Sequence, residues 1–129
     1  MSGRTNFSSG AVWEDVVGYS RAVKVGNIVE VSGTVAADEE GNVIGRDDAF
    51  QQTAYILQKI GRALNEAGCS FKDVVRTRMF VTDISRFNEY AQAHAEVFSS
   101  IKPCTSMIEV RSLVSPDYLI EIEVTAIIA

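Results

Sequence analysis

The sequence predicts an α+β fold, a two-layer sandwich in which two helices cover one face of a mixed six-stranded sheet. Two segments, 47–68 and 86–98, repeat their apolar residues at the spacing of a helix. The last segment, Leu119–Ile128, instead alternates apolar with polar residues, as a strand with one buried face does. Strand-like segments before, between and after the helices favour a sheet covered by helices on one side.

The first ordered element is expected to be a hairpin. Tyr19–Val25 and Ile28–Ser32 flank Gly26-Asn27, a two-residue turn suited to right-twisted strands. A short further strand is expected around Val43 and Ile44, which brings the predicted number of strands to six. The residues before the hairpin are interpreted as an N-terminal arm that Trp13 anchors on the body of the protein.

The longer predicted helix begins at an N-cap, Asp47 or Asp48, and ends before Gly68, which suits a left-handed C-terminal residue. Residues at spacings of three and four form one apolar stripe, namely Phe50, Ala54, Leu57, Ile60, Leu64 and Ala67. This stripe is expected to face the sheet.

The second helix is expected from Arg86 to Phe98, with Ser85 as its N-cap. Its stripe contains the only histidine of the chain, His94. A histidine in such a stripe is typical of a half-buried packing residue, while its pKa near neutrality also makes it an acid–base candidate. Both interpretations stay open.

The remaining strands are predicted at Val74–Val81, Thr105–Arg111 and Leu119–Ile128. The face away from the helices would collect charges of both signs together with apolar residues, namely Arg76, Arg78, Phe80, Met107, Leu119, Glu121, Glu123 and Ile127. Such a face is either solvated, with ion pairs across strands, or covered by another subunit. The apolar members favour an oligomer.

Composition removes several classes of function. The 129 residues are sized for one domain, 1–129, with 12 Lys+Arg against 17 Asp+Glu and a net charge of −5. An acidic chain without a basic patch is not expected to bind nucleic acid. No apolar run is long enough to span a bilayer, and no signal core precedes Val17, so a cytoplasmic protein without a membrane partner is expected. One histidine and two distant cysteines predict no metal site.

Four stretches of the chain are recognisable in their order and spacing. They are GYSRAVKVGNIVEVSG, ALNEAGCSFKDVVRTRMFVTD, KPCTSMIEV and LIEIEVTAI, which together cover about residues 17–128. They resemble the RidA/YjgF family, once labelled endoribonuclease L-PSP and now associated with enamine/imine deamination. The resemblance implies a chorismate-mutase-like fold, a homotrimer with three ligand clefts between subunits, and a reaction that needs no cofactor.

The resemblance also implies which residues form the cleft. Tyr19 would supply an aromatic wall and a phenol, and Ser32 with the amide of Gly33 would hold a carbonyl or anionic oxygen. Glu121 would act as the catalytic acid or base or orient the attacking water. Thr105 begins the cleft strand that follows Pro103.

One departure from the family pattern concerns the substrate clamp. In deaminating members an arginine occupies the position of Thr105 and binds the substrate carboxylate, so this chain resembles an arginine-lacking branch. Arg21 is a candidate substrate-binding replacement, although it would equally suit a salt bridge within the sheet or between subunits. Glu121 has the same alternative, a pair with Arg76 or Arg78.

Three functions follow as hypotheses. The first is a cofactor-free hydrolase of a small enamine, imine or related carbonyl compound that lacks the usual carboxylate. The second is a non-catalytic trimer that binds a small metabolite. The third, a ribonuclease, has only the old family label in its favour and is opposed by the charge of −5.

Overall fold

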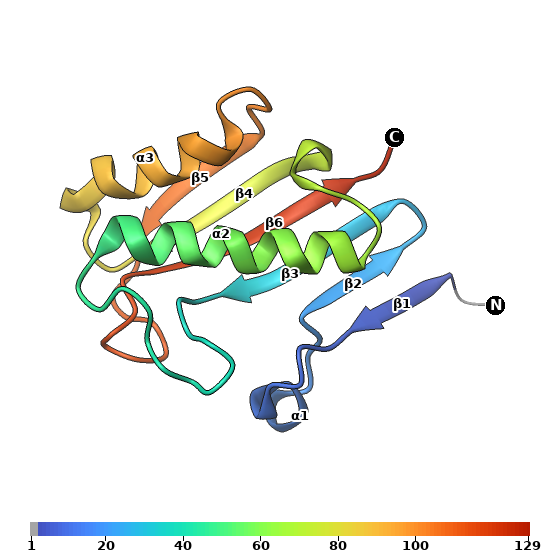
Figure 1. Ribbon diagram of the computed structural model, residues 1–129, viewed down its shortest axis with the longest axis horizontal. Coiled ribbons are helices and arrows are strands. Elements are labelled where there is room, and N and C mark those ends of the chain that lie inside the picture. Colours follow the sequence, from blue (N-terminus) through green and yellow to red (C-terminus); the bar gives the residue numbers. More distant parts are fainter. Residues whose placement is uncertain (1–2) are drawn as a thin grey trace.

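A computed structural model describes residues 3–129, so the first two residues of the predicted 1–129 domain lie outside it. Figure 1 shows one twisted six-stranded sheet whose spatial order is β1-β2-β3-β6-β4-β5. Every neighbouring pair is antiparallel except β4 and β5, which run parallel, so the predicted mixed six-stranded sheet is confirmed. The strands are β1 (Arg4–Phe7), β2 (Ala22–Val25), β3 (Ile28–Thr34), β4 (Val74–Val81), β5 (Cys104–Glu109) and β6 (Ile120–Ile127).

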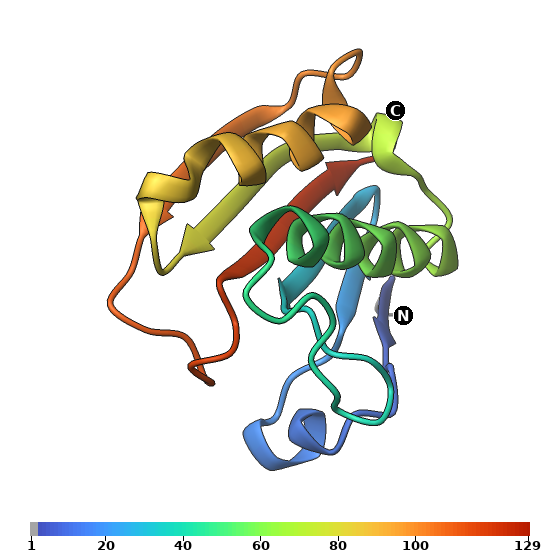
Figure 2. The same cartoon turned by 60° about the vertical axis from the view of Figure 1, so that its left-hand side comes forward.

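Two long helices, α2 (Ala49–Glu66) and α3 (Phe87–Phe98), cover the same face of this sheet. The turned view in Figure 2 shows the two layers clearly, with the opposite face left uncovered by any helix. A short helix, α1 (Val12–Val17), lies at one end of the molecule, and 3₁₀ turns span Phe71–Asp73 and Ile84–Arg86. The predicted α+β sandwich is therefore confirmed, with α1 added.

The identity of one strand was predicted incorrectly. Val43 forms only an isolated bridge with Ala37, and the sixth strand is β1, within the segment expected to be an irregular arm. Four residue pairs join β1 to β2, and the hydrogen bond from the Arg21 amide to the Phe7 carbonyl extends that pairing. The edge of β2 offered unpaired backbone groups, and the N-terminal segment satisfies them.

Helix α2 begins at the predicted cap, since the Asp48 side chain accepts a hydrogen bond from the Gln51 amide, and Gly68 adopts φ 88° just beyond its end. The buried face of α2 is rotated from the predicted stripe, since it includes Gln52 and Thr53, which are both fully buried. Thr53 donates its hydroxyl hydrogen to the Ala49 carbonyl. A polar side chain satisfied in this way occupies the core, which apolar spacing does not reveal.

The start of the second helix also differs from the prediction. Ser85 does not cap α3, whose N-cap residue is Arg86 and makes no side-chain capping bond. Asp83 instead caps the 3₁₀ turn before the helix, and its carboxylate accepts hydrogen bonds from both the amide and the hydroxyl of Ser85. The chain makes a 3₁₀ turn before α3 begins at Phe87, whose side chain is about half exposed. Tyr90 and Phe98 are the large buried residues of the helix.

The core lies between the helices and the sheet. The apolar face of β6 predicted from alternation is confirmed, with Ile120, Ile122, Val124 and Ala126 all buried. Met107 was assigned to the opposite face, but it pairs in register with buried Met79 and packs against the core. No helix among residues 3–129 is long and apolar enough to cross a membrane.

The second face of the sheet carries the predicted mixture of side chains. Arg78 and Glu123 form an ion pair with an N–O distance of 3.6 Å, and Phe80 lies opposite Glu121. Three isoleucines on this face, Ile28, Ile108 and Ile127, are 40–47% exposed. The expected combination of opposite charges and exposed apolar residues is therefore present.

Candidate functional site

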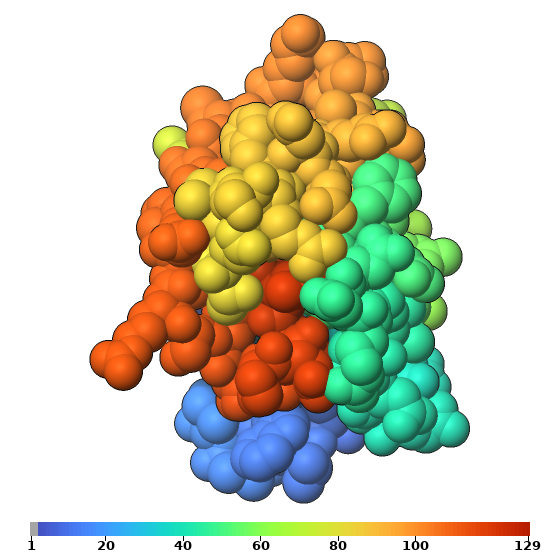
Figure 3. Space-filling view, turned by 90° about the vertical axis from the view of Figure 1, so that its left-hand side faces the viewer, coloured from blue at the N-terminus to red at the C-terminus, as the bar shows by residue number. Residues whose placement is uncertain are grey.

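Five of the six residues proposed from the sequence meet at one end of the sheet, where β2 begins, β3 ends and β6 begins. They are Tyr19, Arg21, Ser32, Gly33 and Glu121. Figure 3 looks at this end of the molecule, with the N-terminal segment in blue and the chain that leads into β6 in red-orange. The irregular pairing of β3 with β6 between Val31 and Thr34 turns the Ser32-Gly33 backbone out of the regular ladder.

The position of the Glu121 side chain depends on the glycine beside it, Gly33. A Cβ atom added at Gly33 would lie only 2.9 Å from the Glu121 Cδ atom and would overlap the carboxylate itself. The missing side chain of Gly33 is thus the space that the carboxyl group occupies. Burial raises the pKa of Glu121 above its ordinary value, the nearby Arg21 guanidinium opposes this rise, and Glu123 adds to it.

Arg21 lies within this group rather than in a salt bridge across the sheet. Its guanidinium donates a hydrogen bond to the Gly33 carbonyl at 2.5 Å and stands 5.7 Å from the centre of the Tyr19 ring. Within residues 3–129 its buried Nε atom has no hydrogen-bond partner. A buried donor without a partner is costly, so Arg21 has capacity for a further acceptor.

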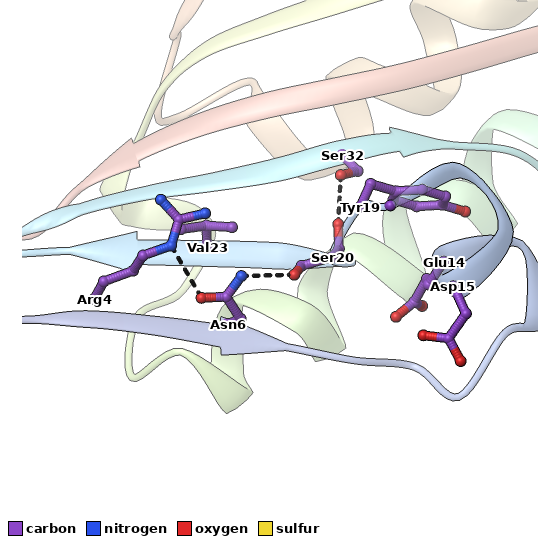
Figure 4. Close-up of a pocket in the computed structure, with 9 residues that line it drawn as sticks. Arg4, Asn6, Glu14, Asp15, Tyr19, Ser20, Val23 and Ser32 are labelled. Carbon is purple, nitrogen blue, oxygen red and sulfur yellow. Dashed lines mark hydrogen bonds between the residues drawn. The ribbon is translucent and has the colours of Figure 1, made fainter.

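A pocket of about 450 Å³ opens next to these residues (Figure 4). Tyr19 and Ser32 line it, and the Ser32 hydroxyl donates to the Ser20 carbonyl at 2.6 Å. Asn6 on β1 donates to the Ser20 hydroxyl at 2.9 Å, as the dashed line in Figure 4 shows. The remaining lining residues are Arg4, Glu14, Asp15, Gly18 and Val23.

Most of the N-terminal side of this pocket was missed by the sequence interpretation. Glu14 is only 5% exposed, and it accepts hydrogen bonds from the amide and the hydroxyl of Ser9. Burial by itself would raise the pKa of Glu14, but these hydrogen bonds hold it below its ordinary value. Gly18, with φ 89°, was the one available signal of a helix end in this segment, and six residues are too few to display helical spacing.

Thr105, the sixth proposed residue, lies elsewhere in the chain. It is on edge strand β5, which β4 separates from β6, and the residue of β6 level with it is Val124, not Glu121. Its hydroxyl is 2.8 Å from the Thr77 hydroxyl, which in turn is 2.9 Å from Nε2 of His94. A single copy of the chain therefore does not bring Thr105 to the other five residues.

The five assembled residues combine a half-buried carboxyl group, a guanidinium, a phenol and backbone polar groups. Such a set can bind a small polar molecule and exchange a proton with it through Glu121. Among the described residues, no cluster of three or more His, Cys, Asp or Glu side chains is placed to hold a metal ion.

Comparison with known proteins gives consistent matches over nearly the whole chain. Residues 11–128 match the family described as endoribonuclease L-PSP. A protein from Acinetobacter baylyi named 3-aminoacrylate deaminase RutC is 39% identical, over 81% of this chain and 82% of its own. A RutC family protein from Pyrococcus abyssi is 36% identical over 84% of each chain.

Solved structures also match nearly the whole chain. A YjgF/YER057c/UK114 family member from Mycobacterium tuberculosis is 46% identical with a TM-score of 0.88, covering 97% of this chain and 99% of its own. A Thermotoga maritima protein titled a putative endoribonuclease is 28% identical with a TM-score of 0.83, covering 96% and 92%.

Proposed function

Because the chain belongs to the endoribonuclease L-PSP family, also called RidA/YjgF, we propose that it binds a small enamine-, imine- or carbonyl-type metabolite in clefts between the subunits of a homotrimer. The Acinetobacter relative named 3-aminoacrylate deaminase supports the choice of compound class. The placement of Glu121 beside Gly33 and Arg21 is the observation that carries the proposal.

The chemistry suited to this site is hydrolytic deamination without a cofactor. Water adds across the C=N bond of an imine, and the resulting carbinolamine then breaks its C–N bond to release ammonia and a carbonyl compound. Glu121 is the catalytic residue in this proposal, taking a proton from the water and returning it to the leaving nitrogen. Its raised pKa suits both roles, because proton exchange is most efficient when the pKa approaches the working pH.

The threonine at position 105 predicts that the substrate lacks a carboxylate. In the proposed trimer, a neighbouring copy contributes its Thr105 to the cleft formed by Tyr19, Ser32 and Glu121. A threonine hydroxyl cannot form the two-pronged, charged contact that arginine makes with a carboxylate. We therefore expect weak activity on 2-imino acids and a preference for substrates without that carboxylate.

Catalysis is tested by generating 2-iminobutyrate in situ and following release of 2-ketobutyrate and ammonia. The wild type should accelerate release only weakly, and Thr105→Arg should raise the rate by roughly tenfold or more, since charged hydrogen bonds are worth about 1.5–3 kcal/mol. Glu121→Gln should abolish the acceleration in both backgrounds. No gain from Thr105→Arg would contradict the assignment of Thr105 to the cleft.

A non-catalytic metabolite-binding trimer is the second candidate, favoured by the uncharged Thr105 hydroxyl and its existing bond to Thr77. A thermal-shift series with small carbonyl and carboxylate metabolites distinguishes the two. Stabilisation of the wild type without turnover supports a binding protein, whereas turnover of every stabilising compound contradicts it.

A further inference from the structure

Three side chains away from Glu121 form a continuous chain of hydrogen bonds. His94 on α3 lies 2.9 Å from the Thr77 hydroxyl on β4, and Thr77 lies 2.8 Å from the Thr105 hydroxyl on β5. Thr77 is fully buried, His94 is half-buried, and Thr105 is exposed. These hydrogen bonds thus lead from the core to a surface hydroxyl, that of Thr105, at the position where the family resemblance implies an arginine.

The direction of these hydrogen bonds follows from counting hydrogens. Thr105 Oγ1 donates to the Pro103 carbonyl at 3.3 Å, and a carbonyl can only accept. Since a hydroxyl has one hydrogen, the bond between the two threonines must be donated by Thr77. Thr77 then has no hydrogen left for His94, so His94 must donate from Nε2–H. This tautomer is assigned by hydrogen-bond accounting.

From this directed chain we propose that the Thr105 hydroxyl is a preset hydrogen-bond donor for a carbonyl or carboxylate oxygen of the ligand, oriented through Thr77 by His94. The inference rests on the proposed function for the existence of a ligand at Thr105. In this assignment Thr105 contacts the ligand, while Thr77 and His94 are positioning residues.

The surroundings of Thr105 suit such a ligand. An open pocket of about 290 Å³ is lined by Thr105, Pro103, Phe98 and His94, with Lys102 as its charged member. At 3.3 Å, the bond from the Thr105 hydroxyl to the Pro103 carbonyl is longer than the roughly 2.5–3.0 Å usual for an O–H···O bond, so an incoming oxygen can replace it at little cost. Lys102 adopts φ 55°, a strained conformation for a residue with a side chain, where the chain leaves α3.

His94 is held as a neutral donor. Its ring packs on Phe98 with centroids 4.6 Å apart, and burial lowers its pKa below the ordinary value. Thr77 and Thr105 are uncharged, and Lys102 is the charged group lining the same pocket. A neutral imidazole with its hydrogen on Nε2 donates to Thr77 at neutral pH, so that Thr77 donates in turn to Thr105. We call this directed set of hydrogen bonds the relay.

The relay itself is tested without any ligand. His94 is the only histidine in the chain, so one set of imidazole ¹⁵N resonances reports its tautomer. The Nε2–H form is expected in the wild type and in Thr77→Ser, which keeps the hydroxyl. Thr105→Val should shift these resonances when introduced into the wild type. It should not shift them when introduced into Thr77→Val, because that variant lacks the hydroxyl that links Thr105 to His94. An Nδ1–H tautomer, or no response to Thr105→Val, would overturn the proposal.

Ligand binding is tested with 2-ketobutyrate, which offers both oxygen types, by calorimetric titration at neutral pH. Thr105→Val and Thr77→Val should each weaken binding roughly two- to tenfold, as expected for one neutral hydrogen bond, and Thr77→Ser should restore the wild-type affinity. Equal affinities for Thr77→Val and Thr77→Ser would overturn the positioning role. If 2-ketobutyrate fails to bind even Thr105→Arg, the proposed function fails, whereas the imidazole test still decides the relay.

Discussion

At the scale of single residues, the site depends on charges held partly out of water. Arg21 lowers the pKa of two groups, the Glu121 carboxyl and the Lys59 amine. Burial acts on these groups in opposite directions, raising the pKa of Glu121 and lowering that of Lys59 to about 8. In both cases burial favours the uncharged form of the group.

Lys59 gives a residue-scale prediction. Its amine donates to the carbonyls of Val35 and Ala37 at 2.9 and 2.8 Å, which fixes the chain leaving β3. Because its folded pKa is lowered from 10.5 to about 8, the unfolded chain binds more protons between these values. The Lys59 contribution to the free energy of unfolding should therefore increase as pH rises from 8 to 10.5.

Urea unfolding at several pH values from 7 to 10.5 measures this contribution as the difference between wild type and Lys59→Met. The difference should grow with pH in favour of the wild type, by an amount that solvent screening of the half-exposed amine reduces. A constant difference would show that Lys59 titrates normally. Lys24→Met, which removes a lysine amine from β2 instead, provides the matched control.

At the scale of elements, α2 organises the molecule by polar as well as apolar contacts. Gln52 is fully buried, and its amide nitrogen donates to the carbonyls of Gly45 and Asp117 while its amide oxygen accepts from the Leu119 amide. One side chain thus ties the start of α2 to the segment that enters β6. This connection places Glu121, two residues beyond Leu119, at the candidate site.

Gly61 gives the element-scale prediction. A Cβ atom at this position of α2 would lie 2.8 and 2.9 Å from two ring carbons of Phe71, whose ring packs edge-on against Phe98. Alanine gains about 1 kcal/mol over glycine in helix propensity, but overpacking typically costs about 1–3 kcal/mol. Gly61→Ala should therefore lower the free energy of unfolding or leave it nearly unchanged.

The comparison that isolates this contact is a double-mutant cycle with Phe71→Leu. In the leucine background the steric conflict is relieved, so Gly61→Ala should become stabilising by up to about 1 kcal/mol. The measurement is chemical unfolding of the four proteins. Stabilisation by Gly61→Ala in the wild-type background would contradict the predicted conflict with the ring.

At the scale of the whole molecule, the two faces of the sheet differ in what covers them within the chain. One face is buried under α2 and α3, while the other exposes apolar residues beside the Arg78–Glu123 ion pair. Thr105 also lies apart from Glu121 within one chain. The proposed trimer would account for both features, because it would cover the second face and bring Thr105 of one copy to the cleft of another.

Ile127→Glu tests this assembly. Ile127 is 40% exposed in the single chain, so the substitution should leave the fold intact while placing a charge in the proposed interface. Light scattering after gel filtration should give three times the chain mass of 14.1 kDa for the wild type and a lower mass for the variant. Phe87→Glu on α3, at a side chain 49% exposed in the helix layer, should remain trimeric. A monomeric wild type would contradict the trimer.

The sequence predicted the elements whose burial follows local spacing. The alternation in β6 and the bounds of β4 match the structure, and Asp48 and Gly68 mark the ends of α2 as expected. It failed where partners distant in the chain decide the outcome. β1 forms because the edge of β2 is free. Gln52 is buried because three backbone groups satisfy it, two of which, at Asp117 and Leu119, are distant in the chain.

The amino-acid sequence by itself determined the fold class and the family, and it predicted five of the residues that meet at the candidate site, since periodicity and motifs are local properties of the chain. Only the tertiary structure decided that Gly33 makes room for the Glu121 carboxyl, and that Arg21 bonds to the Gly33 carbonyl. It also decided that Thr105 joins Thr77 and His94. These relations depend on strand register and on which face of the sheet each side chain takes, and both are set by packing across the whole molecule.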